Sequence, residues 1–178
     1  MSASTARRVP SDGAERSSPP GRGVLVVAIV LGVVVLDQCT KLWAVDRLAD
    51  GPIDVIGSDI GFRLSRNSGG AFSVFQAFTP FLALLAVVLS VILVRAVART
   101  EGRLMLVALA LVLGGALGNL VDRLVRGPGF LRGEVVDFIG VKSFPTFNVA
   151  DSAITIGAAL LMVAVLREPD DADAEAAR

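Results

Sequence analysis

Four long apolar runs constrain the fold of this chain more than any other feature. None contains a charged side chain, and the runs are Gly23–Leu36, Phe81–Val94, Leu104–Gly118 and Ala153–Leu166. With flanking residues, each run approaches the roughly 20 residues that cross a bilayer as a helix. Hydrophobic residues make up 53% of the 178 residues, and the mean hydropathy is +0.69. Soluble domains of this size are much less apolar. The sequence therefore predicts a membrane α-helical protein with four transmembrane helices.

The segments outside these runs predict the domain organisation and the topology. Residues 1–22 are rich in Ser, Pro and Arg and predict a disordered tail, whereas residues 168–178 form an acidic tail. Residues 23–167 form the membrane domain between them. Four helices place both termini on one side, together with the short turn 95–103. The arginines of the N-terminal tail favour the cytoplasm for that side.

Two longer polar segments, 45–78 and 124–147, then face away from the cytoplasm. Within the first, Phe62–Arg66 alternates in polarity like a short strand, and Asn67–Gly70 has turn composition. We expect a hairpin or small sheet lying on the outer membrane surface between the first two helices.

Composition excludes several kinds of chemistry. The chain has no histidine and a single cysteine, Cys39. Histidine-based triads, zinc sites and disulfide frameworks are therefore excluded, and we expect no metal and no cofactor. The net charge of zero gives no indication of a nucleic-acid partner. Any catalysis must come from carboxylates, hydroxyl groups or the two lysines, Lys41 and Lys142.

Polar residues gather where the apolar runs meet the outer segments. Asp37 and Lys41 are four residues apart with the acid first, the favourable order for a pair on one helix face. This pair has either a structural role or a role in a site, and the sequence leaves the choice open. Asn119, Asp122 and Arg123 also share one helix face, because they are spaced by three and four residues.

Asp151 opens the last apolar run. A carboxylate at this position either caps the helix and complements its dipole, or it serves a functional site. The distribution of polar residues favours a shared site, because all of the following map to the outer face: Asp37, Lys41, Asn67, Asn119, Asp122, Arg123, Asp137, Asn148 and Asp151.

Carboxylates without histidine or metal ligands indicate aspartate-pair chemistry. Two nearby carboxyl groups do not both ionise easily, so one holds a proton while the other activates water. Spacing alone leaves the pair open among Asp122, Asp137 and Asp151. The neighbouring Arg123 would keep Asp122 charged and favours a structural role for it. Asp137 has apolar neighbours on both sides, which favours a raised pKa.

These motifs resemble those of the lipoprotein signal peptidases (signal peptidase II), aspartyl peptidases of the bacterial inner membrane. The resemblance spans about residues 24–166, in five segments: Asp37–Lys41, Asn67–Phe72, Gly114–Arg123, Val135–Phe138 and Phe147–Ser152. It implies that Asp137 and Asp151 are the catalytic pair. It also implies substrate-site or supporting roles for Asn67, Asn119, Asp122, Arg123, Asn148, Asp37 and Lys41.

The resemblance further implies a four-helix peptidase domain with an extracytoplasmic β-cradle, consistent with residues 52–75. The implied substrates are prolipoproteins whose lipobox cysteine carries diacylglycerol, and the cut lies just before that cysteine. The implied partners are these prolipoproteins and membrane lipids. The stretch 125–133 is longer than the family pattern, which leaves the geometry near Asp137 open.

The sequence leaves two alternatives to an aspartyl peptidase. A Ser–Lys peptidase would use Lys41 or Lys142 as its base, although no serine occupies a comparably constrained position. An ion-binding or ion-transporting protein would also place acids within the membrane. The chain shows no evident internal repeat of the kind found in many transporters.

Overall fold

The computed structural model describes residues 21–68, 79–127 and 129–167. The two predicted tails, residues 69–75 of the expected cradle and part of the stretch 125–133 lie outside these residues. The elements follow the order α1 (Arg22–Arg47), β1 (Ile53–Ile56), β2 (Ile60–Asn67), α2 (Thr79–Arg99), α3 (Arg103–Val125), β3 (Val135–Val141), β4 (Phe144–Phe147) and α4 (Val149–Arg167).

The four predicted transmembrane helices are confirmed. All four helices are long and apolar enough to cross a membrane, and the chain is a multi-pass membrane protein. The helices extend beyond the apolar runs, most of all α1, which has 26 residues. This extension passes through Asp37 and Lys41, whose charges are paired inside the protein. A paired charge does not end a helix, so apolar runs alone underestimate helix length.

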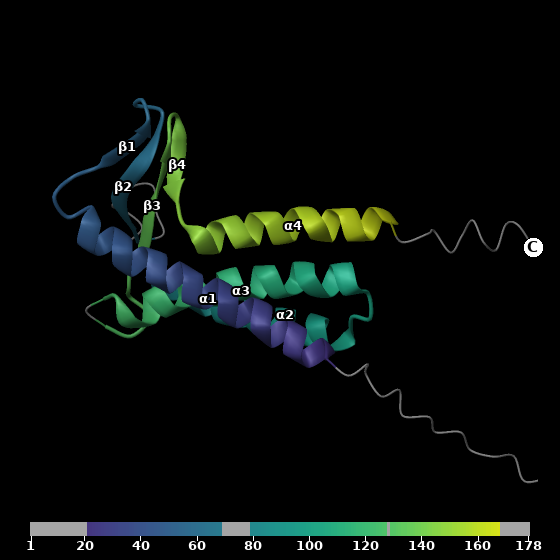
Figure 1. The fold of residues 1–178 in the computed structure, drawn as a ribbon. Coiled ribbons are helices and arrows are strands. Elements are labelled where there is room, and N and C mark those ends of the chain that lie inside the picture. Colours follow the sequence, from purple (N-terminus) through teal and green to yellow (C-terminus); the bar gives the residue numbers. More distant parts are fainter. Residues whose placement is uncertain (1–20, 69–78, 128, 168–178) are drawn as a thin grey trace, which may run out of the picture.

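Helix α3 is the centre of the bundle and packs against α1, α2 and α4 (Figure 1). Its glycines make these close contacts possible. A Cβ atom at Gly114 would lie 2.9 Å from Val33 Cβ on α1, and one at Gly118 would lie 2.8 Å from Asp37 Oδ2. A Cβ atom at Gly115 would collide with the carbonyl oxygen of Ala150 on α4. Gly114 and Gly118 therefore allow the close approach of α1, and Gly115 allows that of α4.

We expect Gly115→Ala to lower the thermal stability of the detergent-purified protein. The added methyl group has no room against Ala150, and overpacking of this kind costs about 1–3 kcal/mol. Gly32→Ala is the matched control, because a Cβ atom at Gly32 on α1 meets nothing within 4 Å. Equal melting temperatures for the two variants would show that the α3–α4 contact is not tight at Gly115.

The polar segments form one four-stranded antiparallel sheet in the order β1-β2-β3-β4. The sequence predicted strands only between the first two helices, whereas β3 and β4 come from the second polar segment. Of the turn expected at Asn67–Gly70, Gly69 and Gly70 lie outside the described residues, and Asn67 belongs to a strand. Asn67 ends β2 and pairs with Val135, and the hairpin turns instead between Ile56 and Ile60, where Gly57 has φ +52°.

An aromatic cluster joins the sheet to the end of α1. The Trp43 ring lies 5.2 Å from the Phe62 ring and 6.2 Å from the Phe138 ring, both in edge-on geometry. Phe138 is buried with Ala44 and Leu48 of the last turns of α1. The sheet therefore stands beyond one end of the bundle (Figure 1), and β3 carries Asp137 to the helix ends.

Candidate active site

The start of α4 is held by a reciprocal pair of hydrogen bonds. The Asp151 backbone N–H donates to Asn148 Oδ1 at 2.9 Å, and the Asn148 backbone N–H donates to Asp151 Oδ2 at 3.2 Å. This arrangement is a capping box built from Asn and Asp. Asp151 therefore does cap the helix, and the cap fixes the position of its carboxylate.

Asp137 lies on β3 and is 2% exposed. Its Oδ1 accepts a hydrogen bond from Asn148 Nδ2 at 2.7 Å, and its Oδ2 accepts one from Asn67 Nδ2 at 3.2 Å. Burial and the negative charge of Asp151 raise the pKa of Asp137, and the hydrogen bonds from Asn67 and Asn148 oppose them, so that the pKa lies at about 6. The raised pKa predicted from its apolar neighbours is confirmed.

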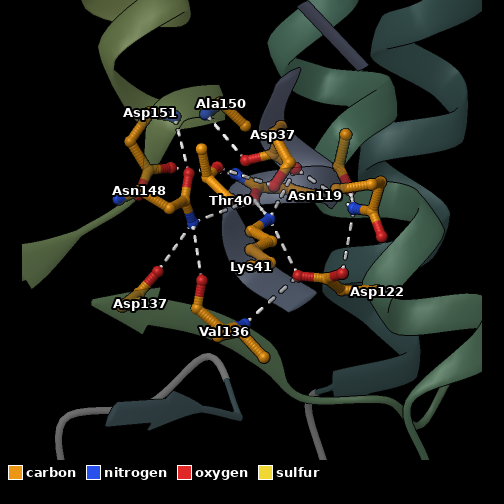
Figure 2. A network of polar contacts seen from close by, with 12 residues as sticks. Asp37, Thr40, Lys41, Asn119, Asp122, Val136, Asp137, Asn148, Ala150 and Asp151 are labelled. Atoms are coloured by element: carbon orange, nitrogen blue, oxygen red, sulfur yellow. Dashed lines mark hydrogen bonds and ion pairs between the residues drawn. The ribbon is translucent and has the colours of Figure 1, made fainter. Parts of the chain in front are cut away.

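Two asparagines connect the two carboxylates (Figure 2). Asn148 donates its side-chain amide to Asp137 and its backbone N–H to Asp151. Asn119 Nδ2 donates to Asp151 Oδ1 at 2.8 Å, and Asn119 Oδ1 accepts from Asn148 Nδ2 at 3.2 Å. The fold thus brings β3, α3 and α4 together around one pair of acids.

Beneath this pair lies a buried ion triad. Lys41 Nζ is 2.8 Å from Asp37 Oδ2 and 2.8 Å from Asp122 Oδ2, and all three side chains are 0% exposed. Lys41 also donates to Asn119 Oδ1 at 3.0 Å. Buried charges require such complete pairing, because removing them from water is costly.

Asp122 interacts electrostatically with Arg123, as predicted, but its ion pairs are with two other cations. Its carboxylate pairs with Lys41 and with Arg126, whose Nε lies 2.7 Å from Oδ1, and it accepts from Gln38 at 3.1 Å. Arg123 follows Asp122 directly in sequence, so its side chain leaves the helix about 100° away. Charge neighbours along the chain are not neighbours on a helix.

The triad also fixes the backbone beside each acid of the pair. Asp37 Oδ1 accepts a hydrogen bond from the backbone N–H of Ala150 at 3.0 Å. Asp122 Oδ2 accepts one from the backbone N–H of Val136 at 3.1 Å. These two residues directly precede Asp151 and Asp137. The open question about Asp37 and Lys41 is thereby answered in favour of positioning, since they hold the elements that carry the acids.

Arg123 is the polar residue of the site with a spare donor. Its Nη1 is buried and has no hydrogen-bond partner among the described residues. Its guanidinium group interacts electrostatically with Asp122, Asp137 and Asp151. Unpaired buried donors are rare in folded proteins and commonly serve a ligand.

A cavity of about 490 Å³ opens beside Asp151, between β4 and the first turns of α4. Its lining is mostly apolar and consists of Phe144, Pro145, Thr146, Phe147, Asp151, Ser152, Thr155 and Ile156. An apolar group bound next to the acid pair therefore has space available.

Sequence reasoning missed two residues of the network. Gln38 lies next to Asp37 and donates to both Asp37 and Asp122. Arg126 follows Asp122 by four residues, a spacing that already favours pairing on a helix. The long stretch after α3 folds back on the helix end, since the Gly133 N–H donates to Arg123 O at 3.0 Å. After this stretch, β3 begins at Val135, which pairs with Asn67 of β2.

The geometry also argues against the Ser–Lys alternative. Lys41 Nζ contacts the carboxylates of Asp37 and Asp122 and donates to Asn119 Oδ1, so its hydrogen-bonding positions are already used. Lys142 lies in the exposed turn between β3 and β4 and pairs with Asp59 at 2.8 Å. Neither lysine is placed to activate a serine.

We expect Cys39 to be dispensable for activity and folding. It is exposed on α1, and no histidine exists to activate it. Cys39→Ala should retain full activity, and thiol alkylation of the unmodified protein should leave turnover unchanged. Loss of turnover in folded Cys39→Ala protein would instead indicate a thiol mechanism.

The fold defines a multi-pass membrane protein in which two acids, bridged by amides, lie at the helix ends. The family described as Signal peptidase (SPase) II matches residues 29–167. The chain belongs to this signal peptidase II family and is a membrane peptidase.

Relatives and solved structures agree with this assignment. A lipoprotein signal peptidase of Mycobacterium avium (strain 104) is 43% identical over 151 residues, 84% of this chain and 83% of the relative. One of Rhodococcus jostii (strain RHA1) is 45% identical over 150 residues, 82% of this chain and 76% of the relative. A solved bacterial membrane enzyme has a TM-score of 0.72 and 31% identity, over 82% of this chain and 89% of that one.

Proposed function

We propose that this chain is an aspartyl endopeptidase that removes signal peptides from prolipoproteins, with Asp137 and Asp151 as its catalytic pair. The observation that carries the proposal is the bridging of these two carboxylates by Asn119 and Asn148 over a buried ion triad. No histidine is present to supply an acid or a base, so the two carboxyl groups must serve both functions.

In the proposed mechanism, the pair shares one proton at rest. The raised pKa of Asp137 favours the proton on this residue, although the proton belongs to the coupled pair. The ionised Asp151 takes a proton from water, and the resulting hydroxide attacks the scissile carbonyl carbon. Asp137 gives its proton to the carbonyl oxygen. Asp151 then gives its proton to the leaving amine as the C–N bond breaks, and a hydroxyl group of the tetrahedral intermediate returns a proton to Asp137. One proton is thereby left on the pair.

The remaining polar residues either bind the substrate or hold the two catalytic carboxylates in place. The free Nη1 donor of Arg123 is suited to a backbone carbonyl of the bound peptide. Asn67 and Asn148 both donate to Asp137, which limits its orientation, and Asn119 does the same for Asp151. Lys41, Asp37 and Asp122 act through these groups and not on the substrate itself.

The proposed substrate carries diacylglycerol on the lipobox cysteine and is cut just before it. The relatives are named lipoprotein signal peptidases. The mostly apolar cavity beside Asp151 suits an apolar part of such a substrate near the scissile bond. In this proposal residues 23–167 form the peptidase domain, and the segments 1–22 and 168–178 are cytoplasmic tails.

We expect the sheet and the acid pair to face the extracytoplasmic side of a bacterial cytoplasmic membrane. Topology reporters inserted at Asp59 and at Gly129 should therefore be active only outside the cytoplasm. Asp59 lies in the turn between β1 and β2, and Gly129 lies between α3 and β3. Helix α1 begins and α4 ends on the side of the bundle away from the sheet (Figure 1). Cytoplasmic labelling at either position would overturn the proposed location of the site.

The test of the proposed function is cleavage by the purified protein. A peptide with a diacylglyceryl lipobox cysteine should be cut just before that cysteine, without added metal. A Ser–Lys peptidase would instead tolerate Asp137→Asn, and one that used Lys142 as its base would lose activity in Lys142→Met. An ion-binding protein would show no cleavage at all.

A further inference from the structure

A groove of about 570 Å³ runs between α2 and α3, away from the acid pair. It is lined by Val87, Ser90, Val91, Val94, Arg95, Leu113, Leu117 and Leu120. The Ser90 hydroxyl donates to Ala86 O at 2.8 Å, so its hydrogen is already used. The walls are otherwise aliphatic up to Arg95. The groove thus joins a long apolar surface to a single cationic end.

The cationic end lies opposite the sheet and lacks a counter-charge. Arg95 and Arg99 are four residues apart on α2 and hence on one face, where like charges repel. Neither arginine is ion-paired within the described ranges, whereas the exposed Arg63 and Lys142 both have acidic partners. An anion beside Arg95 and Arg99 would remove this repulsion.

A third arginine adds positive charge at the same end of the bundle. The Arg22 guanidinium donates from Nη2 to Val97 O at 2.6 Å and to Ala98 O at 3.3 Å. It therefore caps the carbonyl groups at the C-terminal end of α2 and ties α1 to that helix. These carbonyls consequently do not neutralise Arg95 or Arg99.

We propose that this groove binds an anionic phospholipid. Its phosphate lies on Arg95 and Arg99, and one acyl chain follows the aliphatic walls between α2 and α3. From Arg95 to Val87 the α2 wall rises about 12 Å, which accommodates much of an acyl chain. Basic pockets between membrane helices bind anionic lipid headgroups by this combination of contacts. The site is separate from the peptidase site and is not part of its chemistry.

The test is lipid-dependent thermal stability of the full-length protein in detergent, without substrate. Dioleoylphosphatidylglycerol should raise the melting temperature saturably. Dioleoylphosphatidylcholine, which has the same chains, and inorganic phosphate should not. Arg95→Gln and Arg99→Gln should each weaken the apparent affinity for phosphatidylglycerol about fivefold. Leu117→Trp, which fills the groove, should weaken it without changing any charge.

The matched control is Arg167→Gln, which removes an arginine from the same side of the bundle at the last residue of α4. It should leave the affinity unchanged. Equal weakening in Arg167→Gln and Arg95→Gln would overturn the proposal in favour of unspecific surface charge. An effect that appears only after deletion of residues 168–178 would also overturn it, because the acidic segment would then be the occupant. Peptidase activity is not measured, so the result stands apart from the proposed function.

Discussion

Replacing either Asp137 or Asp151 with asparagine is expected to lower peptidase turnover about 10³-fold or more. Each carboxyl group supplies one half of an acid–base pair, and the remaining one cannot act as acid and base at once. The double variant should therefore be hardly worse than either single variant, as for other catalytic groups that act as a unit. The measurement is cleavage of a diacylglyceryl lipobox peptide by purified, folded variants. Independent, multiplicative losses in the double variant would contradict a joint role.

The stability of Asp137→Asn provides the folding control for this prediction. Burial raises the pKa of Asp137 from 3.8 to about 6, so the folded state carries an unfavourable charge above that pH. The Asp137 carboxyl group contributes most to the stability of the folded state below about pH 4, and this contribution is lost as the pH rises through about 6. At pH 7 this loss lowers the free energy of unfolding by roughly 3 kcal/mol. The asparagine variant should thus melt no lower than the parent at pH 7 while being inactive.

Replacing Lys41 with methionine is expected to destabilise the protein by about 3–5 kcal/mol. The substitution leaves Asp37 and Asp122 buried at 0% exposure with no shared cation, which is costly in the protein interior. The backbone contacts to Ala150 and Val136 should loosen with them, so activity should fall as well. The measurement is thermal unfolding in detergent, with turnover measured below the melting temperature.

Lys142→Met is the matched control for Lys41→Met. Lys142 also pairs with an aspartate at 2.8 Å, but both side chains are more than half exposed. Exposed pairs contribute about 0–1 kcal/mol, so this variant should unfold almost like the parent. Similar destabilisation of the two variants would show that the buried triad does not hold the site together.

Much of the bundle follows from the sequence, because a bilayer imposes a strict length on each apolar run. The predicted topology also placed the site residues together, because helix ends on one side of a membrane lie at the same membrane surface. Asn119, Asn148, Asp137 and Asp151 do meet at that face. The local sequence pattern at Asp151 left capping and function as alternatives. In the structure the cap and the proximity to Asp137 coexist.

The sheet and the triad were less predictable, for physical reasons. Strand β3 is stabilised by pairing with β2 and by the aromatic contact with Trp43 of α1, contacts that join distant parts of the chain. Strand β4 in turn pairs with β3. The ion pairs of Asp122 with Lys41 and Arg126 were missed, because helix geometry and not chain adjacency decides which charges lie within ion-pair distance. The hydrogen bonds that the backbone N–H groups of Val136 and Ala150 donate cannot be read from the sequence, although they help to orient both acids.

The most direct test of the catalytic pair compares Asp137→Asn with Asp122→Asn in the same cleavage assay. Both residues are buried acids close to the site, at 2% and 0% exposure, but only Asp137 is bridged to Asp151 by an asparagine amide. We predict that Asp137→Asn has almost no turnover, whereas Asp122→Asn melts at a lower temperature and retains measurable turnover. Substantial turnover in Asp137→Asn together with none in folded Asp122→Asn would contradict the assignment.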